Sequence, residues 1–218
     1  MISLKLSSRY GLTYVIIALN VLVYVYTAIL GGDFINIGYA PLLLYGQVNL
    51  FVMQGWYWQL FTSMFVHANI VHLAGNMFFF LIFGLRAEEL FDSKQYLLIY
   101  FLSGLAGNLL SLAVAPYSTI ADVGASGAIF GVFGACIIYV GRSIGRSIIG
   151  ALAFAFFLLL MSAGPNVNSM AHLGGLVIGL LIGYALATRR KTRTGYGFNY
   201  SYSVNAGHSP QQHFQEKP

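Results

Sequence analysis

The chain has 218 residues, of which 58% are hydrophobic and 8% are charged, and its mean hydropathy is +0.74. These values exclude an ordinary soluble globular protein and indicate a polytopic membrane protein. A single cysteine, Cys136, excludes a disulfide within one chain and a Cys-based metal cage, and its apolar surroundings favour a small core residue. The net charge of +5 would favour nucleic acid in a soluble protein, but the charges follow membrane topology here, so no nucleic-acid partner is expected.

Six apolar segments are candidate membrane spans, although several of them are short. They are residues 10–30, 69–87, 95–116, 126–141, 147–163 and 170–188. The first segment is longer than a signal-peptide core and lacks a clear cleavage site, so we expect it to stay as an anchor. The predicted fold is therefore an all-α bundle of six membrane helices over residues 10–190.

The positive charges predict the orientation of this bundle. All eleven Lys and Arg residues lie before the first span, between spans two and three, between spans four and five, or after span six. The loops 31–68, 117–125 and 164–169 contain none. By the positive-inside rule both termini are cytoplasmic, which agrees with an even number of spans. We expect residues 1–9 to be a short cytoplasmic N-terminus and the polar residues 191–218 to be a disordered cytoplasmic tail.

The loop of residues 31–68 differs from the other loops because it is long, largely apolar and rich in aromatic residues. It ends in the run Gly55-Trp56-Tyr57-Trp58-Gln59. Tryptophan and tyrosine favour the depth of the lipid headgroups. We therefore predict short helices that lie in the outer membrane interface.

Polar residues cluster at the N-terminal ends of spans two, four and six. His72 and Asn76 lie in the first turns of span two, Ser126 begins span four, and His172 lies in the first turn of span six. These three spans run in the same direction, so their N-terminal turns share one depth near the outer face. Polar and ionisable groups are costly at membrane depth, and a shared site is the simplest cause of their coincidence.

The residue types at this depth predict acyl-transfer chemistry. A serine hydroxyl becomes a good nucleophile when a base takes its proton, and His172 is the candidate base for Ser126. His72 and Asn76 are four residues apart on one helix face, and they could donate hydrogen bonds to an oxyanion together with the backbone N–H of Ser126. We interpret Asp122, in the loop before Ser126, as a solvated loop residue, and we expect His67 to be structural. The predicted catalytic set is then Ser126 and His172, without an acidic side chain as a third member.

Glycines on spans four and six predict how these helices meet. His172, Gly175, Gly179 and Gly183 form one stripe on span six, and Gly127, Gly131 and Gly134 form a matching surface on span four. Small residues at this spacing let two helices approach closely. Because each residue turns a helix by about 100°, Ser126 falls at the edge of this seam, beside His172.

The motif Gly124-Ala125-Ser126-Gly127, His172 and the span-two pattern His67-xxxx-His72-xxx-Asn76 closely resemble the rhomboid family of intramembrane serine proteases. The resemblance covers about residues 50–185. By position it implies Ser126 as nucleophile, His172 as general base, and His72 and Asn76 at the oxyanion. The surrounding glycines, Gly124, Gly127, Gly175 and Gly179, match the motifs of the family.

The resemblance also assigns structural positions and one departure. Phe130 stands where relatives carry an aromatic that packs against the catalytic histidine, and Glu88 matches a structural glutamate at the cytoplasmic end of span two. Many relatives have Trp-Arg where this chain has Trp58-Gln59. The arginine is a structural feature of the first loop, so its absence leaves open how this loop is anchored. Span five and the loop from Ser162 to Met170 are expected to gate and cap the site.

The function implied by the resemblance is hydrolysis of peptide bonds in the membrane-spanning segments of other proteins, near the outer face of the cell membrane. It implies transmembrane protein substrates and the lipid bilayer as partners, with no cofactor and no metal. By the same resemblance, substrates tend to have small residues at the cut and a helix that unwinds easily, since backbone hydrogen bonds must break before Ser126 reaches the carbonyl.

Two other functions remain as alternatives. A non-proteolytic rhomboid-like protein would bind membrane clients, but such proteins typically lack the serine or the histidine. A small transporter or metal carrier would use the intramembrane histidines, but His67-xxxx-His72 does not match the His-Glu-x-x-His zinc pattern.

Overall fold

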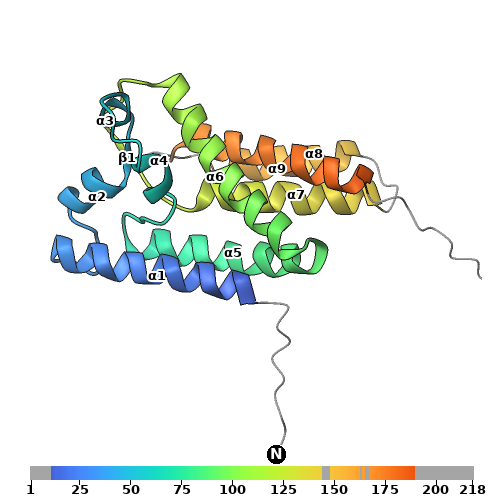
Figure 1. The fold of residues 1–218 in the computed structure, drawn as a ribbon, viewed down its shortest axis with the longest axis horizontal. Coiled ribbons are helices and arrows are strands. Elements are labelled where there is room, and N and C mark those ends of the chain that lie inside the picture. Colours follow the sequence, from blue (N-terminus) through green and yellow to red (C-terminus); the bar gives the residue numbers. More distant parts are fainter. Residues whose placement is uncertain (1–10, 144–147, 163, 165–166, 190–218) are drawn as a thin grey trace, which may run out of the picture.

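The computed structural model of the protein describes residues 11–143, 148–162, 164 and 167–189, and these residues are mostly α-helical (Figure 1). The long or strongly apolar helices are α1 (Gly11–Gly31), α5 (Ile70–Leu90), α6 (Ser93–Val114), α7 (Ser126–Ser143), α8 (Ile148–Met161) and α9 (Ser169–Arg189). The connections contain the short helices α2 (Tyr39–Tyr45), α3 (Asn49–Met53) and α4 (Gln59–Thr62) and the strands β1 (Gln47–Val48) and β2 (Ala121–Asp122).

The helical bundle confirms the predicted all-α polytopic membrane fold. Within the described residues, α1, α5, α6, α7 and α9 are long and apolar enough to cross a membrane. The fifth predicted span, 147–163, corresponds to α8, which is apolar but only 14 residues long. The predicted N-terminus, 1–9, and the predicted tail, 191–218, lie outside the described residues.

Helix α7 is the centre of the bundle. It packs against α9, α6, α5 and α8. Of its 18 residues 61% are buried, compared with 28% of the most apolar 18 residues in α1 and in α5. Figure 1 shows α1 alongside α5, with α7, α8 and α9 in a second group and α6 crossing between them. The residues at the start of α7 are therefore surrounded by protein on several sides.

The predicted glycine seam between α7 and α9 is present. A Cβ atom added at Gly175 would lie 2.0 Å from the carbonyl oxygen of Gly127, and one added at Gly179 would lie 2.0 Å from that of Gly131. The next contact of the series pairs Gly183 with Ala135, and the predicted Gly134 also meets α9, since a Cβ there would lie 3.0 Å from the carbonyl oxygen of Leu176. Residues 127, 131 and 135 follow a four-residue repeat on one face of α7, and Gly134, three residues after Gly131, lies on the same side of the helix.

The first loop consists of short helices, as predicted, and Gln59 anchors it. The Gln59 side chain is fully buried; its Nε2 donates to the carbonyl of Leu43 at 2.7 Å, and its Oε1 accepts from the backbone N–H of Val48 at 2.9 Å. The amide thus satisfies two loop backbone groups, at the position for which the resemblance implies an arginine. The location of this loop at the membrane interface stays a prediction.

Two further sequence interpretations concern the interior, and both agree with the structure. Glu88 is buried near the C-terminal end of α5, where its carboxylate accepts the backbone N–H of Thr13 at 2.6 Å and ties α5 to the start of α1. Cys136 is buried as a free thiol in the core.

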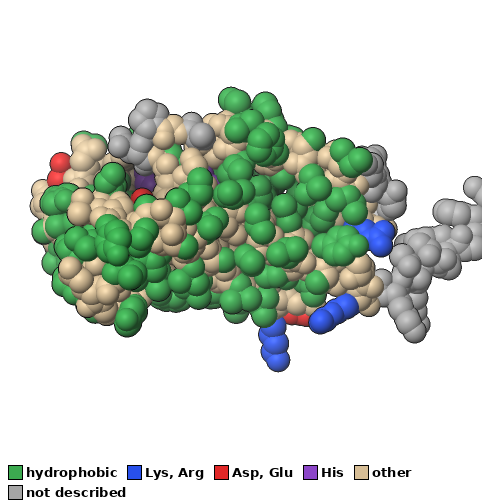
Figure 2. All heavy atoms as spheres, turned by 90° about the horizontal axis from the view of Figure 1, so that it is seen from above, with side chains coloured by type: hydrophobic (Ala, Val, Ile, Leu, Met, Phe, Trp, Pro, Cys, Tyr) green, Lys and Arg blue, Asp and Glu red, His purple; other side chains and the backbone are tan. Residues whose placement is uncertain are grey.

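Hydrophobic side chains cover much of the face shown in Figure 2, as expected for a protein surrounded by lipid. In this view His side chains are visible in a recess in the left half of the molecule, whereas the Lys and Arg side chains lie farther right. The candidate site and the basic residues therefore occupy different parts of the bundle.

Candidate active site

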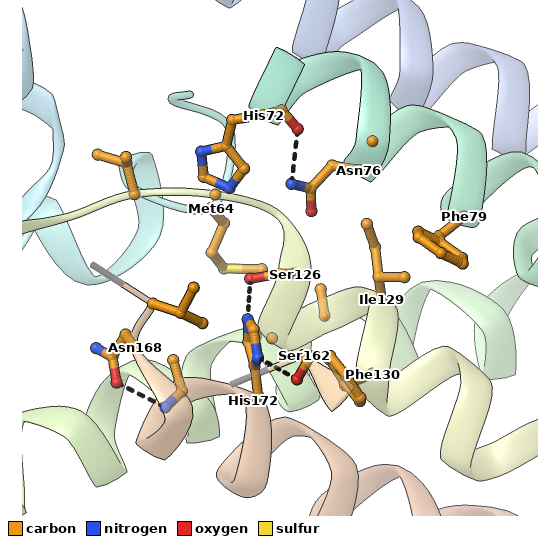
Figure 3. Close-up of a pocket in the computed structure, with 18 of the residues that line it drawn as sticks. Met64, His72, Asn76, Phe79, Ser126, Ile129, Phe130, Ser162, Asn168 and His172 are labelled. Carbon is orange, nitrogen blue, oxygen red and sulfur yellow. Dashed lines mark hydrogen bonds between the residues drawn. The ribbon is translucent and has the colours of Figure 1, made fainter. Parts of the chain in front are cut away.

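Ser126 and His172 are in direct contact. The Oγ of Ser126 lies 2.7 Å from the Nε2 of His172, and the two side chains point toward one another (Figure 3). Ser126 is the first residue of α7, and His172 lies in the first turn of α9. The close approach of the two backbones at Gly127, directly after Ser126, and Gly175, three residues after His172, places these two helix starts side by side.

Gly124 gives the chain the bend that it needs before α7. Its φ is +129°, a region that L side chains rarely adopt, and a Cβ there would also lie 3.0 Å from the His72 ring. Its N–H donates to the carbonyl of Ser63 at 2.9 Å. The glycine before the serine is thus explained by backbone geometry and by the space that His72 occupies.

His72 and Asn76 face the same cavity as Ser126 and His172. Together these four side chains line a space of about 410 Å³, and they come from α5, α7 and α9 (Figure 3). Asn76 Nδ2 donates to the carbonyl of His72 at 2.9 Å, which holds the amide in place and leaves its second N–H for another acceptor. The structure therefore brings together all four residues selected from the sequence.

Phe130 and His67 support the two histidines of the cavity. The Phe130 ring stacks on His172 with centroids 4.7 Å apart, as the resemblance implies. His67 is fully buried, packs edge-on against His72 at 5.1 Å, and donates from Nδ1 to the carbonyl of Phe65 at 3.2 Å. Burial, together with nearby His72, lowers the pKa of His67 to about 3, so this side chain is neutral and acts structurally.

The sequence interpretation missed a second hydrogen-bond partner of His172. The Oγ of Ser162 lies 3.1 Å from His172 Nδ1, on the side of the ring opposite Ser126. Ser162 follows α8 directly and is ten residues before His172 in the chain. No spacing rule points to a serine at the end of an apolar helix, so only the folded structure reveals this contact.

The interpretation of Asp122 as a solvated loop residue is wrong. Asp122 is partly buried in β2, and its Oδ2 accepts from Asn168 Nδ2 at 2.6 Å and from Ser111 Oγ at 3.1 Å. The residue pairs with Gln47 across the two-stranded sheet, which carries it inward between the loops. Burial raises the pKa of Asp122, while the hydrogen bonds from Ser111 and Asn168 act against this rise.

Asn168 connects this carboxylate to the helix of the candidate base. Its Oδ1 accepts the backbone N–H of Ala171 at 3.0 Å and so caps the start of α9. Asn168 stands three residues before Ala171 at the entry to an apolar run, a pattern typical of helix N-caps that could have identified it. Asp122 thus ties the loop before Ser126 to the turn that carries His172.

We expect Asp122→Asn to change the pH dependence of stability. The pKa of Asp122 is raised in the folded protein, so the folded state holds this proton more tightly than the unfolded state, and the contribution of this residue to stability falls as pH rises through that range. An asparagine keeps an acceptor for Asn168 without a buried charge. Thermal unfolding in detergent from pH 4 to 8 should show a weaker loss of stability with rising pH in Asp122→Asn.

Asp122→Ala is the comparison for this measurement, because it removes the acceptor as well as the charge. It should lower the melting temperature at every pH. A stability curve of Asp122→Asn parallel to that of the unmodified protein would contradict the assignment.

Among residues 11–143, 148–162, 164 and 167–189, no three side chains of His, Cys, Asp or Glu lie close enough together to hold a metal ion.

Comparison with known proteins identifies relatives over most of the chain. The sequence model of the Rhomboid domain matches residues 54–189. The chain is 34% identical to the Rhomboid protease GluP of Bacillus subtilis over 80% of this chain and 34% of the relative. It is 35% identical to the Putative rhomboid protease YdcA of the same organism over 66% of this chain and 75% of the relative.

A plant relative is similar over a shorter region. The RHOMBOID-like protein 6, mitochondrial, of Arabidopsis thaliana is 38% identical over 59% of this chain and 43% of the relative. The chain thus spans less than half the length of this protein and of GluP. The domain match covers most of the chain and includes α5 to α9, on which Ser126, His172, His72 and Asn76 lie. The chain is an integral membrane protein that belongs to the rhomboid family.

Proposed function

We propose that this protein is an intramembrane serine endopeptidase that cleaves transmembrane segments of other proteins with Ser126 and His172. The observation that carries the proposal is the 2.7 Å contact between Ser126 Oγ and His172 Nε2 at the wall of a cavity. Membership of a family in which two relatives bear the name rhomboid protease supports the same activity.

The first step is acylation of Ser126. His172 Nε2 takes the hydroxyl proton as Oγ attacks the carbonyl carbon of the scissile bond, and a tetrahedral intermediate with a negatively charged oxygen forms. The candidate donors to this oxygen are the Ser126 backbone N–H, which has no acceptor within its own helix because it stands at the helix start, and the side chains of His72 and Asn76. His172 then returns the proton to the leaving amine. In deacylation, His172 takes a proton from a water molecule as its oxygen attacks the acyl carbon. The bond to Ser126 Oγ then breaks, His172 returns the proton to Oγ, and the new carboxyl end of the substrate is released.

The walls of the cavity fit an apolar substrate. Beyond the polar groups, it is lined by side chains of α5, α7 and α8, among them Phe79, Phe133 and Leu158. Such a lining excludes charged chains and accepts the apolar residues of a membrane segment. The segment must be unwound near the cut, since a helical peptide bond is shielded by its own hydrogen bonds.

The orientation of the site follows from the charges. The positive-inside rule places the Lys and Arg residues on the cytoplasmic side. Ser126 begins α7, and Arg142 lies near the other end of the same helix. We therefore propose that both termini are cytoplasmic and that the site opens toward the outer face of the cell membrane.

A client-binding protein without catalysis is the competing function. It would not need a base in contact with the serine, whereas the contact between Ser126 and His172 is the arrangement that nucleophilic catalysis requires. The contact favours the peptidase.

The deciding experiment uses the purified protein in liposomes with a fluorescent transmembrane substrate and, separately, a fluorophosphonate probe. We expect substrate cleavage and covalent capture of the probe on Ser126, identified by mass spectrometry. Substrate binding without cleavage or labelling would favour the client-binding function. Activity that chelators remove, without any labelling, would favour metal chemistry.

A further inference from the structure

The contact between Ser162 and His172 shows how the candidate base is held. The two ring nitrogens of His172 have different partners: Nε2 contacts Ser126 Oγ at 2.7 Å, and Nδ1 contacts Ser162 Oγ at 3.1 Å (Figure 3). The imidazole therefore lies between a hydroxyl at the start of α7 and a hydroxyl in the turn after α8, and one face of the ring is covered by Phe130.

The hydrogen-bond directions follow from a third contact. Ser162 Oγ donates its only hydrogen to the carbonyl of Leu159 at 2.7 Å. Toward His172 it can then present only a lone pair, so it accepts the Nδ1–H of the imidazole. With its proton on Nδ1, His172 has a free lone pair on Nε2, where it faces the hydroxyl of Ser126.

We propose that Ser162 is a positioning residue that selects the Nδ1–H tautomer of His172 and holds its ring toward Ser126. This inference rests on the proposed peptidase function and assigns a third residue to it. In other serine hydrolases a buried carboxylate has this role. Here a neutral hydroxyl, itself held by the Leu159 carbonyl, occupies the corresponding place.

Asp122, a carboxylate that lines the same cavity as His172, does not fill this role. Its Oδ2 is engaged by Ser111 and Asn168, and it supports the backbone at the start of α9. The acceptor at Nδ1 belongs to Ser162. Backbone capping and ring orientation are thus supplied by different residues.

The position of Ser162 makes the geometry of the base depend on α8. Among the residues of this helix only Ala155 is buried, and it packs with Phe133 of α7 and Leu176 of α9. The last turn of α8 must rest against the start of α9 for the Ser162 contact to form. The orientation of the His172 ring therefore depends on how α7, α8 and α9 pack against one another.

The test compares Ser162→Ala, Ser162→Thr and Leu160→Ala in liposomes. Ser162→Ala removes the acceptor, and we expect kcat to fall about tenfold with KM unchanged within about twofold, because the lost hydrogen bond matters most when the ring carries positive charge. Ser162→Thr keeps the hydroxyl and the bond to the i−3 carbonyl, so it should restore kcat. Leu160→Ala removes an exposed side chain of the same turn and should change neither constant.

The rate of fluorophosphonate labelling separates a positioning role from an effect on substrate entry. The small probe depends on the nucleophilicity of Ser126, so Ser162→Ala should slow its labelling about tenfold as well. An unchanged labelling rate, a change confined to KM, or equal loss in Ser162→Thr would overturn the inference. In each case the unmodified protein still cleaves and is labelled, whereas an inactive unmodified protein would refute the proposed function itself.

Discussion

Ser126→Ala should abolish cleavage of a transmembrane substrate, and His172→Ala should do so to nearly the same extent. Without the hydroxyl no acyl-enzyme forms, and without the imidazole at 2.7 Å no group takes the proton from Ser126. Losses of about 10⁴-fold or more in kcat are typical when such a unit is broken. The measurement is single-turnover cleavage in liposomes, with the amount of folded protein fixed by size-exclusion chromatography.

The double variant distinguishes a catalytic pair from two independent residues. Because Ser126 and His172 act in one step, removing both should cost no more than removing one. Ser143→Ala, at the exposed far end of the same helix, is the matched control and should keep full activity. Substantial cleavage by His172→Ala would mean that another base serves Ser126.

Gly179→Ala should prevent stable folding, although it adds a single methyl group. The new Cβ would lie 2.0 Å from the carbonyl oxygen of Gly131 and 2.6 Å from its Cα, so the backbones of α7 and α9 would have to separate. Overpacking of this kind costs about 3 kcal/mol or more when backbone atoms are the obstacle. The melting temperature in detergent and the yield of monodisperse protein measure the effect.

Gly150→Ala provides the control for this substitution. Gly150 lies in α8 with nothing within 4 Å of an added Cβ, so alanine there should be neutral or stabilising by its higher helix propensity. Equal stability of Gly179→Ala and Gly150→Ala would show that the seam between α7 and α9 yields more easily than its geometry indicates.

Much of the fold was predictable because it depends on local or regularly repeated features. The apolar segments gave the membrane helices to within a few residues; α7, for example, begins at Ser126 as expected and ends at Ser143. The glycine seam was also predictable, since a four-residue repeat of small residues is a property of one helix surface at a time. Gly134 meets α9 as expected, and the structure adds Ala135 as the partner of Gly183.

The residues that were missed or misread share a different cause. Asp122 has neighbours in the sequence that are typical of a loop, and its burial comes from pairing with Gln47, which lies far from it in the chain. Ser162 carries no motif, because its partner is chosen by where α8 ends relative to α9. Such contacts depend on the relative placement of distant segments, which no local pattern encodes.

The sequence by itself determined the membrane fold, the family resemblance and the four polar residues of the site, because hydrophobic length, charge placement and helical spacing are written along the chain. Only the tertiary structure decided which group meets each nitrogen of His172. A hydrogen bond forms only when donor and acceptor lie about 3 Å apart, and the packing of the helices sets which groups come that close. In the structure Ser126 contacts Nε2 and Ser162 contacts Nδ1. Asp122 is partly buried and accepts a hydrogen bond from Asn168, the residue that caps α9.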